Sequence, residues 1–189
     1  FMVVATPSGV TLAPEGGAHQ SISTPLIGLG QPGLTMFEPA YADELAQIMR
    51  WGFEHMQDDN GGSIYLRLST RSIEQPEREL DDRMAGDVLA GAYWQVEPGP
   101  DAELALVYSG AVAPEVMAAY AEMADDIPGL GVMAVPSVDR LYHGWQKSLR
   151  GRNGSGLGSS HVETLLSRLA PGAALVTAQD GHPATLSWI

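Results

Sequence analysis

Cysteine is absent from this 189-residue chain. Its absence excludes disulfide-stapled folds, thiolate zinc sites and cysteine nucleophiles. Basic residues are also scarce, because only 10 Lys and Arg stand against 23 Asp and Glu, giving a formal net charge of −13. Nucleic acid is therefore a poor partner, since phosphate binding needs clustered cations. We expect no nucleic-acid partner and a cytoplasmic setting.

Long apolar runs are missing as well. No stretch of 18 or more apolar residues occurs, so we expect no membrane partner. No basic segment followed by an apolar run opens the chain, so we expect no secretory signal. The apolar share of 44% is enough to build a packed core. The chain begins at Phe1 and stops at Ile189, whereas natural termini tend to be polar, so we expect a fragment of a longer protein.

Several common catalytic motifs are also lacking. The sequence contains no G-x-x-x-x-G-K-[ST] phosphate loop, no H-E-x-x-H metal pair and no G-x-S-x-G nucleophile elbow. The run Gly154–Gly158 is similar to a dinucleotide loop, but its spacing is wrong and it follows a predicted helix rather than a strand. We interpret it as a surface loop.

The first half of the chain alternates strand and helix. Apolar residues predict short extended pieces at 2–5 and 10–12, and glycine and proline predict a loop at 27–33. A buried strand is expected at 34–37, a helix at 40–57 with apolar residues every three or four positions, and an alternating strand at 63–69. A strand, a helix and a strand with this crossover length predict a parallel βαβ unit.

The second half repeats the alternation after a polar, proline-broken stretch at 70–88, and we expect a domain boundary or linker near 76–88. Strands are predicted at 91–96, 103–109, 131–135 and 173–178, and helices at about 114–125, 138–149 and 161–169. The order β-β-α-β-α-α-β indicates an α/β fold with a Rossmann-like sheet.

The sharpest chemical candidates are Glu15 and His19, which lie in one glycine-rich loop after an apolar run that ends in proline. Glutamate and histidine are general acid–base residues, and glycines let a bound group approach the backbone closely. Loops at strand ends are where α/β folds place chemistry. The alternative is a plain turn with two packing residues.

Other polar residues are weaker candidates. His182 follows the last predicted strand, and His55 lies near a helix end where a solvated structural role is expected. His143 and His161 have no evident partner. Arg71 could bind an anion, whereas strand alternation predicts that Arg67 points outward as an ordinary surface residue.

The loop Glu15–Ser21, the run 31–45 (QPGLTMFEPAYADEL), the strand 63–71 (SIYLRLSTR) and the tail 179–186 (QDGHPATL) resemble one family. That family is the homodimeric-type, thiamine-diphosphate-dependent decarboxylating component of the pyruvate dehydrogenase complex, within the transketolase-like superfamily. The resemblance is strongest over residues 9–76 and looser over 86–189. Glu15 and His19 stand four positions apart, as in this family, whereas the equivalent transketolase loop has five.

The resemblance implies a domain plan and a cofactor. Residues 1–80 would be the back half of the pyrimidine-binding middle domain, 81–88 a linker, and 89–189 a truncated transketolase C-terminal-like domain. The full-length enzyme would bind thiamine diphosphate and Mg²⁺, but the diphosphate-binding motif is missing from this chain.

The resemblance also implies an activity. The full-length enzyme would decarboxylate pyruvate oxidatively, as part of glycolytic carbon flow, and pass the acetyl unit to a lipoyl group on the acetyltransferase component. It would be a homodimer, and the fragment alone would be inactive. His19 would stabilise the substrate or its intermediate, and Glu15 would hold that histidine or the substrate carboxyl region.

Two alternatives stay open. A transketolase-like enzyme would transfer two-carbon units between sugar phosphates, although the scarcity of basic residues speaks against phosphate substrates. A non-catalytic assembly or dimerisation module would need neither diphosphate nor metal ligands.

Overall fold

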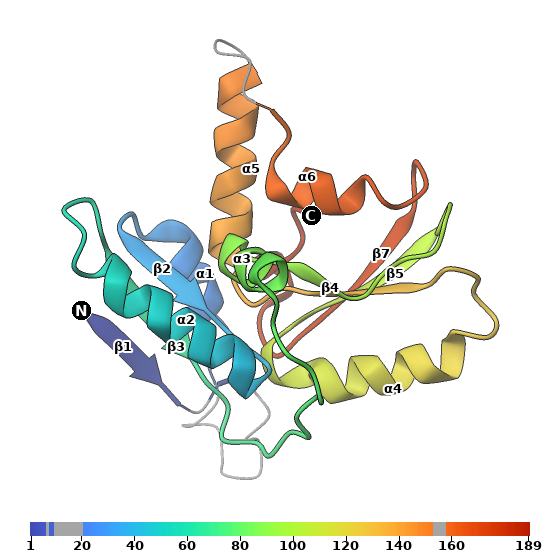
Figure 1. Cartoon of the computed structure of the whole chain (residues 1–189), viewed down its shortest axis with the longest axis horizontal. Helices are drawn as coiled ribbons and strands as arrows, with labels where there is room; N and C mark the ends of the chain where they lie inside the picture. Colours follow the sequence, from blue (N-terminus) through green and yellow to red (C-terminus); the bar gives the residue numbers. More distant parts are fainter. Residues whose placement is uncertain (7, 10–20, 153–157) are drawn as a thin grey trace.

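The chain folds into two sheets that lie side by side (Figure 1). A computed structural model describes residues 1–6, 8, 9, 21–152 and 158–189. The first sheet and its helices comprise β1 (Met2–Ala5), α1 (Thr24–Gly30), β2 (Leu34–Phe37), α2 (Ala42–His55) and β3 (Ser63–Arg67). The second group comprises α3 (Asp82–Ala90), β4 (Tyr93–Val96), β5 (Leu104–Ser109), α4 (Ala113–Met123), β6 (Gly131–Ala134), α5 (Val138–Arg152), α6 (His161–Leu166) and β7 (Ala174–Gln179).

The first sheet has three parallel strands in the order β1-β3-β2. Helix α2 connects β2 to β3, so the predicted parallel βαβ unit is confirmed. Ile64 and Leu66 of β3 and Ile48 of α2 are completely buried. A side chain at Gly52 of α2 would lie 2.7 Å from the Ile64 Cδ1 atom, so this glycine allows the helix to pack closely against the sheet.

The second sheet has four strands in the order β4-β6-β5-β7. Strands β5, β6 and β7 are parallel, and β4 is antiparallel to β6. The predicted order of strands and helices in this half is confirmed. Helices α3 and α4 contribute to the core on one face of this sheet, and α5 and α6 contribute to the core on the other face.

One expectation about local structure was wrong, and one helix lies in a segment for which no helix was predicted. Residues 27–33 were expected to be loop, but α1 runs from Thr24 to Gly30 with Pro25 in its first turn, where proline is tolerated. Most of the expected linker at 81–88 is helix α3. Its start is capped by Asp81, whose side chain accepts a hydrogen bond of 2.7 Å from the Met84 backbone N–H. A single polar turn with a good cap begins a helix even where composition suggests a connector.

The two sheets share one hydrophobic core, which includes Phe37 and Leu66 from the first and Tyr108 and Val132 from the second. A buried polar cluster also connects the two sheets. The Glu44 carboxylate is 1% exposed, accepts hydrogen bonds from the Ala40 and Tyr41 backbone N–H groups at 2.7 and 3.1 Å, and accepts one from the Tyr93 hydroxyl. Burial raises the pKa of Glu44, so its ionised form depends on these donors.

We expect Tyr93→Phe to lower the free energy of unfolding by about 1–3 kcal/mol, because a buried carboxylate loses a hydrogen-bond donor. Urea unfolding of the two proteins measures this difference. Tyr120→Phe on α4 is the matched control, since the Tyr120 hydroxyl makes no hydrogen bond within the described residues; it should change stability by less than about 0.5 kcal/mol. Equal losses for the two variants would contradict the assignment.

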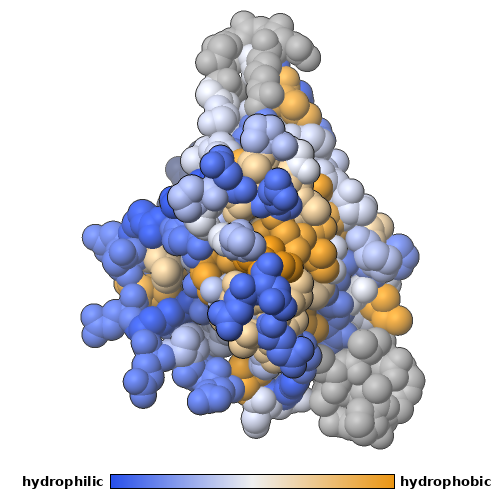
Figure 2. All heavy atoms as spheres, turned by 90° about the vertical axis from the view of Figure 1, so that its right-hand side faces the viewer, coloured by the Kyte–Doolittle hydropathy of each residue, from blue (hydrophilic) through white to orange (hydrophobic). Residues whose placement is uncertain are grey.

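The outer surface combines apolar and charged areas. Seen from the right-hand side of Figure 1, apolar side chains gather in the centre of the face and hydrophilic ones surround them (Figure 2). Strand β7 forms one edge of the second sheet, and its Val176 is 52% exposed. Within the described residues, no helix is both long and apolar enough to span a membrane.

Candidate functional site

The candidate site lies where the carboxyl ends of the two sheets meet. Strand β2 is followed by Glu38, strand β3 ends at Arg67, and strand β7 is followed by Asp180. All three residues are buried, with exposed fractions of 5%, 1% and 2%. Carboxyl ends of parallel strands are where open α/β folds bind their ligands. Charged side chains that are buried at such a place need specific partners.

Arg67 is the centre of this cluster, and the prediction that it points outward was wrong. Its guanidinium donates to the Glu38 carboxylate, to the backbone oxygens of Ser21 at 2.6 Å and Asp180 at 2.7 Å, and to the Thr24 hydroxyl at 3.1 Å. The alternation along β3 predicts which side chains share a face of the sheet, but it does not predict which segments pack on that face. Here, the chain around Ser21 and the turn at Asp180 cover it.

Glu38 is held in the same cluster. Burial raises the pKa of its carboxyl to about 7; the Arg67 charge opposes this rise and the Asp180 charge adds to it. Gly110, after β5, has φ +67°, and a Cβ there would lie 2.6 Å from the Glu38 Cγ and Oε1 atoms. The second sheet therefore approaches Glu38 through a glycine backbone.

The loop that contains Glu15 and His19 begins and ends at this cluster. Gly9 and Ser21 form an antiparallel bridge, in which the Ser21 N–H donates to the Gly9 oxygen at 3.2 Å. Gly9 has φ +59°, and a Cβ there would lie 2.1 Å from the Asp180 Cγ atom, so any other residue would collide with it. Glu15 and His19 themselves lie outside the described residues.

The weaker candidates have structural partners. The His182 side chain accepts a hydrogen bond from the Ala184 N–H at 3.1 Å, and thereby caps a short 3₁₀ turn at 183–185. The His55 Nε2 atom accepts a hydrogen bond from the Gly62 N–H at 3.0 Å, in the turn after α2. The His161 Nε2 atom lies 2.7 Å from the Ala92 oxygen. Most of the 154–158 loop lies outside the described residues.

Arg71, proposed above as a possible anion ligand, already has an ionic partner. Its guanidinium pairs with the Glu115 carboxylate of α4 and donates to the Ala111 oxygen at 3.1 Å. It lines a cavity of about 190 Å³ close to the carboxyl ends of β2 and β3. An incoming anion would have to displace Glu115.

The described residues contain no group of three or more His, Cys, Asp and Glu side chains that could hold a metal ion. What sequence reasoning missed is the cluster of Glu38, Arg67 and Asp180. A usable signal existed, because Glu38 directly follows the strand predicted at 34–37 and Asp180 lies two positions after the strand predicted at 173–178.

The chain is also similar in sequence to known proteins. The chain is 28% identical over 130 residues to the pyruvate dehydrogenase E1 component of Mycolicibacterium smegmatis, which covers 67% of this chain and 14% of that protein. It is 26% identical over 143 residues to the Escherichia coli K12 E1 component, covering 75% and 16%. The match thus spans about one-seventh of these relatives. No protein-family model matches the chain.

Solved structures resemble the whole chain. Transketolase from Campylobacter jejuni superimposes with a TM-score of 0.71 and 18% identity, over 98% of this chain and 25% of that one. A split-gene transketolase, described as an inactive β4 tetramer, superimposes with a TM-score of 0.52 and 18% identity, over 94% and 56%. The chain therefore has a transketolase-type α/β fold and is similar in sequence to part of the pyruvate dehydrogenase E1 component.

Proposed function

We propose that this chain is part of a thiamine-diphosphate-dependent enzyme that decarboxylates pyruvate and transfers the acetyl unit to a lipoyl group. The observation that carries the proposal is the sequence similarity to two E1 components over most of the chain. The geometry supports it, because the loop of Glu15 and His19 starts and ends at the carboxyl ends of parallel strands, where α/β enzymes bind substrates.

The proposed domain plan assigns residues 1–80 to a pyrimidine-binding domain, 81–88 to the connection and 89–189 to a C-terminal domain. Each assigned domain contains one of the two sheets. Thiamine diphosphate would supply an electron sink for the decarboxylation. Because the diphosphate-binding motif of that family is missing from this chain, the proposal places the diphosphate and metal sites elsewhere in the complete protein.

In this proposal, His19 hydrogen-bonds the substrate and stabilises the charge that develops on it. Glu15 orients His19 or contacts the carboxyl region of the substrate. Arg67 acts as a positioning residue, because its bonds to the Ser21 and Asp180 oxygens fix one end of the loop against the second sheet. A second copy of the subunit and a lipoyl-bearing acetyltransferase would be the partners, and the open sheet edge at β7 is a surface available for association.

The test is His19→Ala in the complete gene product, assayed for pyruvate decarboxylation with thiamine diphosphate and Mg²⁺. We expect at least a tenfold loss of rate, equivalent to about 1.4 kcal/mol in the barrier. His182→Ala serves as the matched control, since His182 caps a surface turn, and should retain the rate. An unchanged rate for His19→Ala would remove its catalytic assignment.

A second candidate activity is two-carbon transfer between sugar phosphates, because a solved transketolase shares the fold of this chain. A substrate screen of the complete protein separates the two. Turnover of pyruvate without turnover of ketose phosphates supports the proposal, and the reverse pattern overturns it. The 189-residue chain alone should be inactive, as the split-gene transketolase tetramer is described to be.

A further inference from the structure

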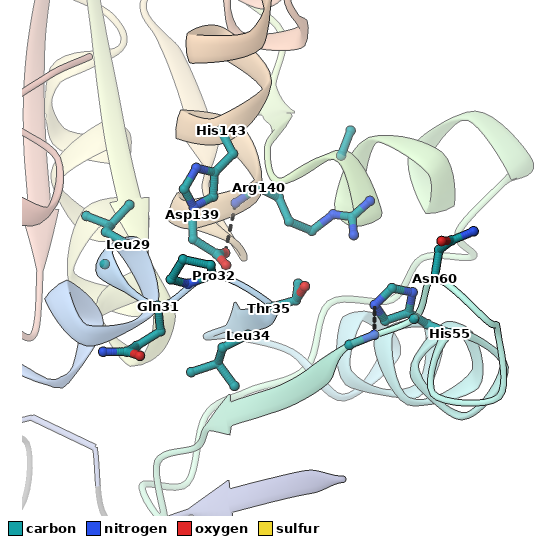
Figure 3. A pocket seen from close by; sticks show the side chains of 15 residues that line it. Leu29, Gln31, Pro32, Leu34, Thr35, His55, Asn60, Asp139, Arg140 and His143 are labelled. Atoms are coloured by element: carbon teal, nitrogen blue, oxygen red, sulfur yellow. Dashed lines mark hydrogen bonds between the residues drawn. The ribbon is translucent and has the colours of Figure 1, made fainter.

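A second cavity lies at the opposite end of the first sheet from the Arg67 cluster. It has a volume of about 600 Å³ and lies between the turn after α1, the turn after α2 and the start of α5. Figure 3 shows its lining. We call it the Arg140 cleft, defined by Leu29, Pro32, Leu34, Thr35, His55 and Arg140. None of these residues takes part in the function proposed above.

Among the described residues, Arg140 is the one arginine or lysine that lines this cleft. Its guanidinium lies 4.5 Å from the centre of the Trp51 ring and 5.9 Å from that of Phe37. Trp51 in turn stacks on His55, with ring centres 4.5 Å apart. The cation is therefore held in place by aromatic rings rather than by a carboxylate.

Arg140 also has unused hydrogen-bonding capacity. Its Nε atom is buried and has no partner, and no carboxylate oxygen of the described residues lies within 4.0 Å of its guanidinium nitrogens. Five other arginines do have such a partner: Arg67, Arg71, Arg78, Arg83 and Arg168. Within the described residues, Arg50 and Arg150 also lack a carboxylate partner, but both are exposed, whereas Arg140 is partly buried. A half-buried cation with free donors is favourable for an anion.

Asp139 is the carboxylate in the lining, and its hydrogen bonds go to groups other than the Arg140 guanidinium. Its oxygens accept hydrogen bonds from the Met36 N–H at 2.9 Å, the Ser137 hydroxyl at 2.6 Å and the Arg140 backbone N–H at 2.8 Å. The Arg140 side chain extends away from Asp139, over Thr35 and toward the side where His55 and Asn60 lie (Figure 3). The Asp139 charge therefore acts on the Arg140 guanidinium through space only, and no ion pair within 4.0 Å joins the two side chains.

The opposite part of the cleft is lined by the apolar Leu29, Pro32 and Leu34 and by the polar Gln31 and His143 (Figure 3). Pockets that combine apolar side chains with a few well-placed polar or charged groups suit small molecules that have one apolar and one charged end. We propose that the Arg140 cleft binds a small organic anion, whose carboxylate or phosphate group pairs with Arg140 while its apolar part lies against Leu29, Pro32 and Leu34.

The test uses the complete 189-residue chain, labelled with ¹⁵N, and follows the Arg140 Nε–H and the backbone signals of Thr35 and Gly61 by NMR. The probes are benzoate, phenyl phosphate and the neutral benzyl alcohol. We expect saturable shifts with a millimolar or tighter Kd for at least one anion and none for benzyl alcohol. Comparison of benzoate with phenyl phosphate identifies the preferred anionic group.

Arg140→Gln should weaken anion binding at least tenfold. Arg140→Lys, which keeps the charge over Trp51 but lacks the forked donor geometry, should weaken it several-fold, and it reports on the site even if the glutamine variant folds poorly. Arg50→Gln is the control, because Arg50 is exposed on α2 and its side chain donates a hydrogen bond to Gln47 and to no other described residue; this variant should bind the anion as tightly as the unchanged chain does. No saturable shift with either anion, or equal binding by all variants, would overturn the proposal. Neither result bears on pyruvate decarboxylation.

Discussion

Replacing Arg67 by methionine should lower the free energy of unfolding by about 3–5 kcal/mol. The substitution keeps most of the side-chain volume but removes a cation that is 1% exposed. It leaves the Glu38 carboxylate and the Ser21 and Asp180 oxygens without their donor. Breaking a buried ion pair from one side is costly because the remaining charge is neither solvated nor paired. Urea unfolding gives the difference directly.

Two further variants show whether this loss belongs to the pair. Arg83→Met removes an arginine of which the side chain is 67% exposed and which lies 3.7 Å from Asp87, and it should cost less than about 1 kcal/mol. The double variant Glu38→Gln/Arg67→Met should recover part of the loss, because no buried charge is then left alone. If Arg67→Met cost no more than Arg83→Met, Arg67 would not connect the two sheets.

Stability should also depend on pH through Glu38. Burial raises the pKa of Glu38 in the folded chain to about 7, compared with 4.5 for the ordinary group. Between these two values the folded state binds the additional proton, so this contribution to stability is present in full below pH 4.5 and is lost as the pH rises toward 7. The loss can reach about 3 kcal/mol.

The measurement compares the unchanged chain with Glu38→Gln at several pH values from 5 to 8. Because glutamine does not titrate, the stability difference between the two proteins should shift in favour of the variant as the pH rises. The comparison also removes the general effect of the net charge of −13, which both proteins largely share. Parallel stability curves over this range would show that Glu38 ionises normally, and would contradict the prediction.

The sequence predicted well those features that depend on neighbouring residues. The apolar spacing of Leu45, Ile48 and Gly52 is enough to predict α2, and the alternation of Ile64 and Leu66 is enough to predict β3. Prediction from the sequence failed in segments that form helices although their composition is typical of loops. Helix α1 contains three residues that are proline or glycine, and α3 begins in a polar segment, so the general propensities gave the wrong answer.

For the candidate loop, too, the sequence and the structure contribute different information. The residue types in Glu15–Ser21 predict acid–base chemistry and, by resemblance, a role in a pyruvate dehydrogenase. The loop positions of Glu15 and His19 stay a prediction, since they lie outside the described residues. The structure adds the base of that loop, where Gly9 must be glycine because Asp180, 171 positions along the chain, occupies the space of a side chain.

By itself, the sequence determined most of the strands and helices and the α/β class, because periodic burial acts between residues that are close along the chain. Only the tertiary structure decided that Arg67 is buried, that burial raises the pKa of Glu38 to about 7 and that Arg140 lines a cleft and stacks on Trp51. These properties depend on what covers a side chain, and the covering groups at Asp180 and Trp51 come from distant parts of the chain.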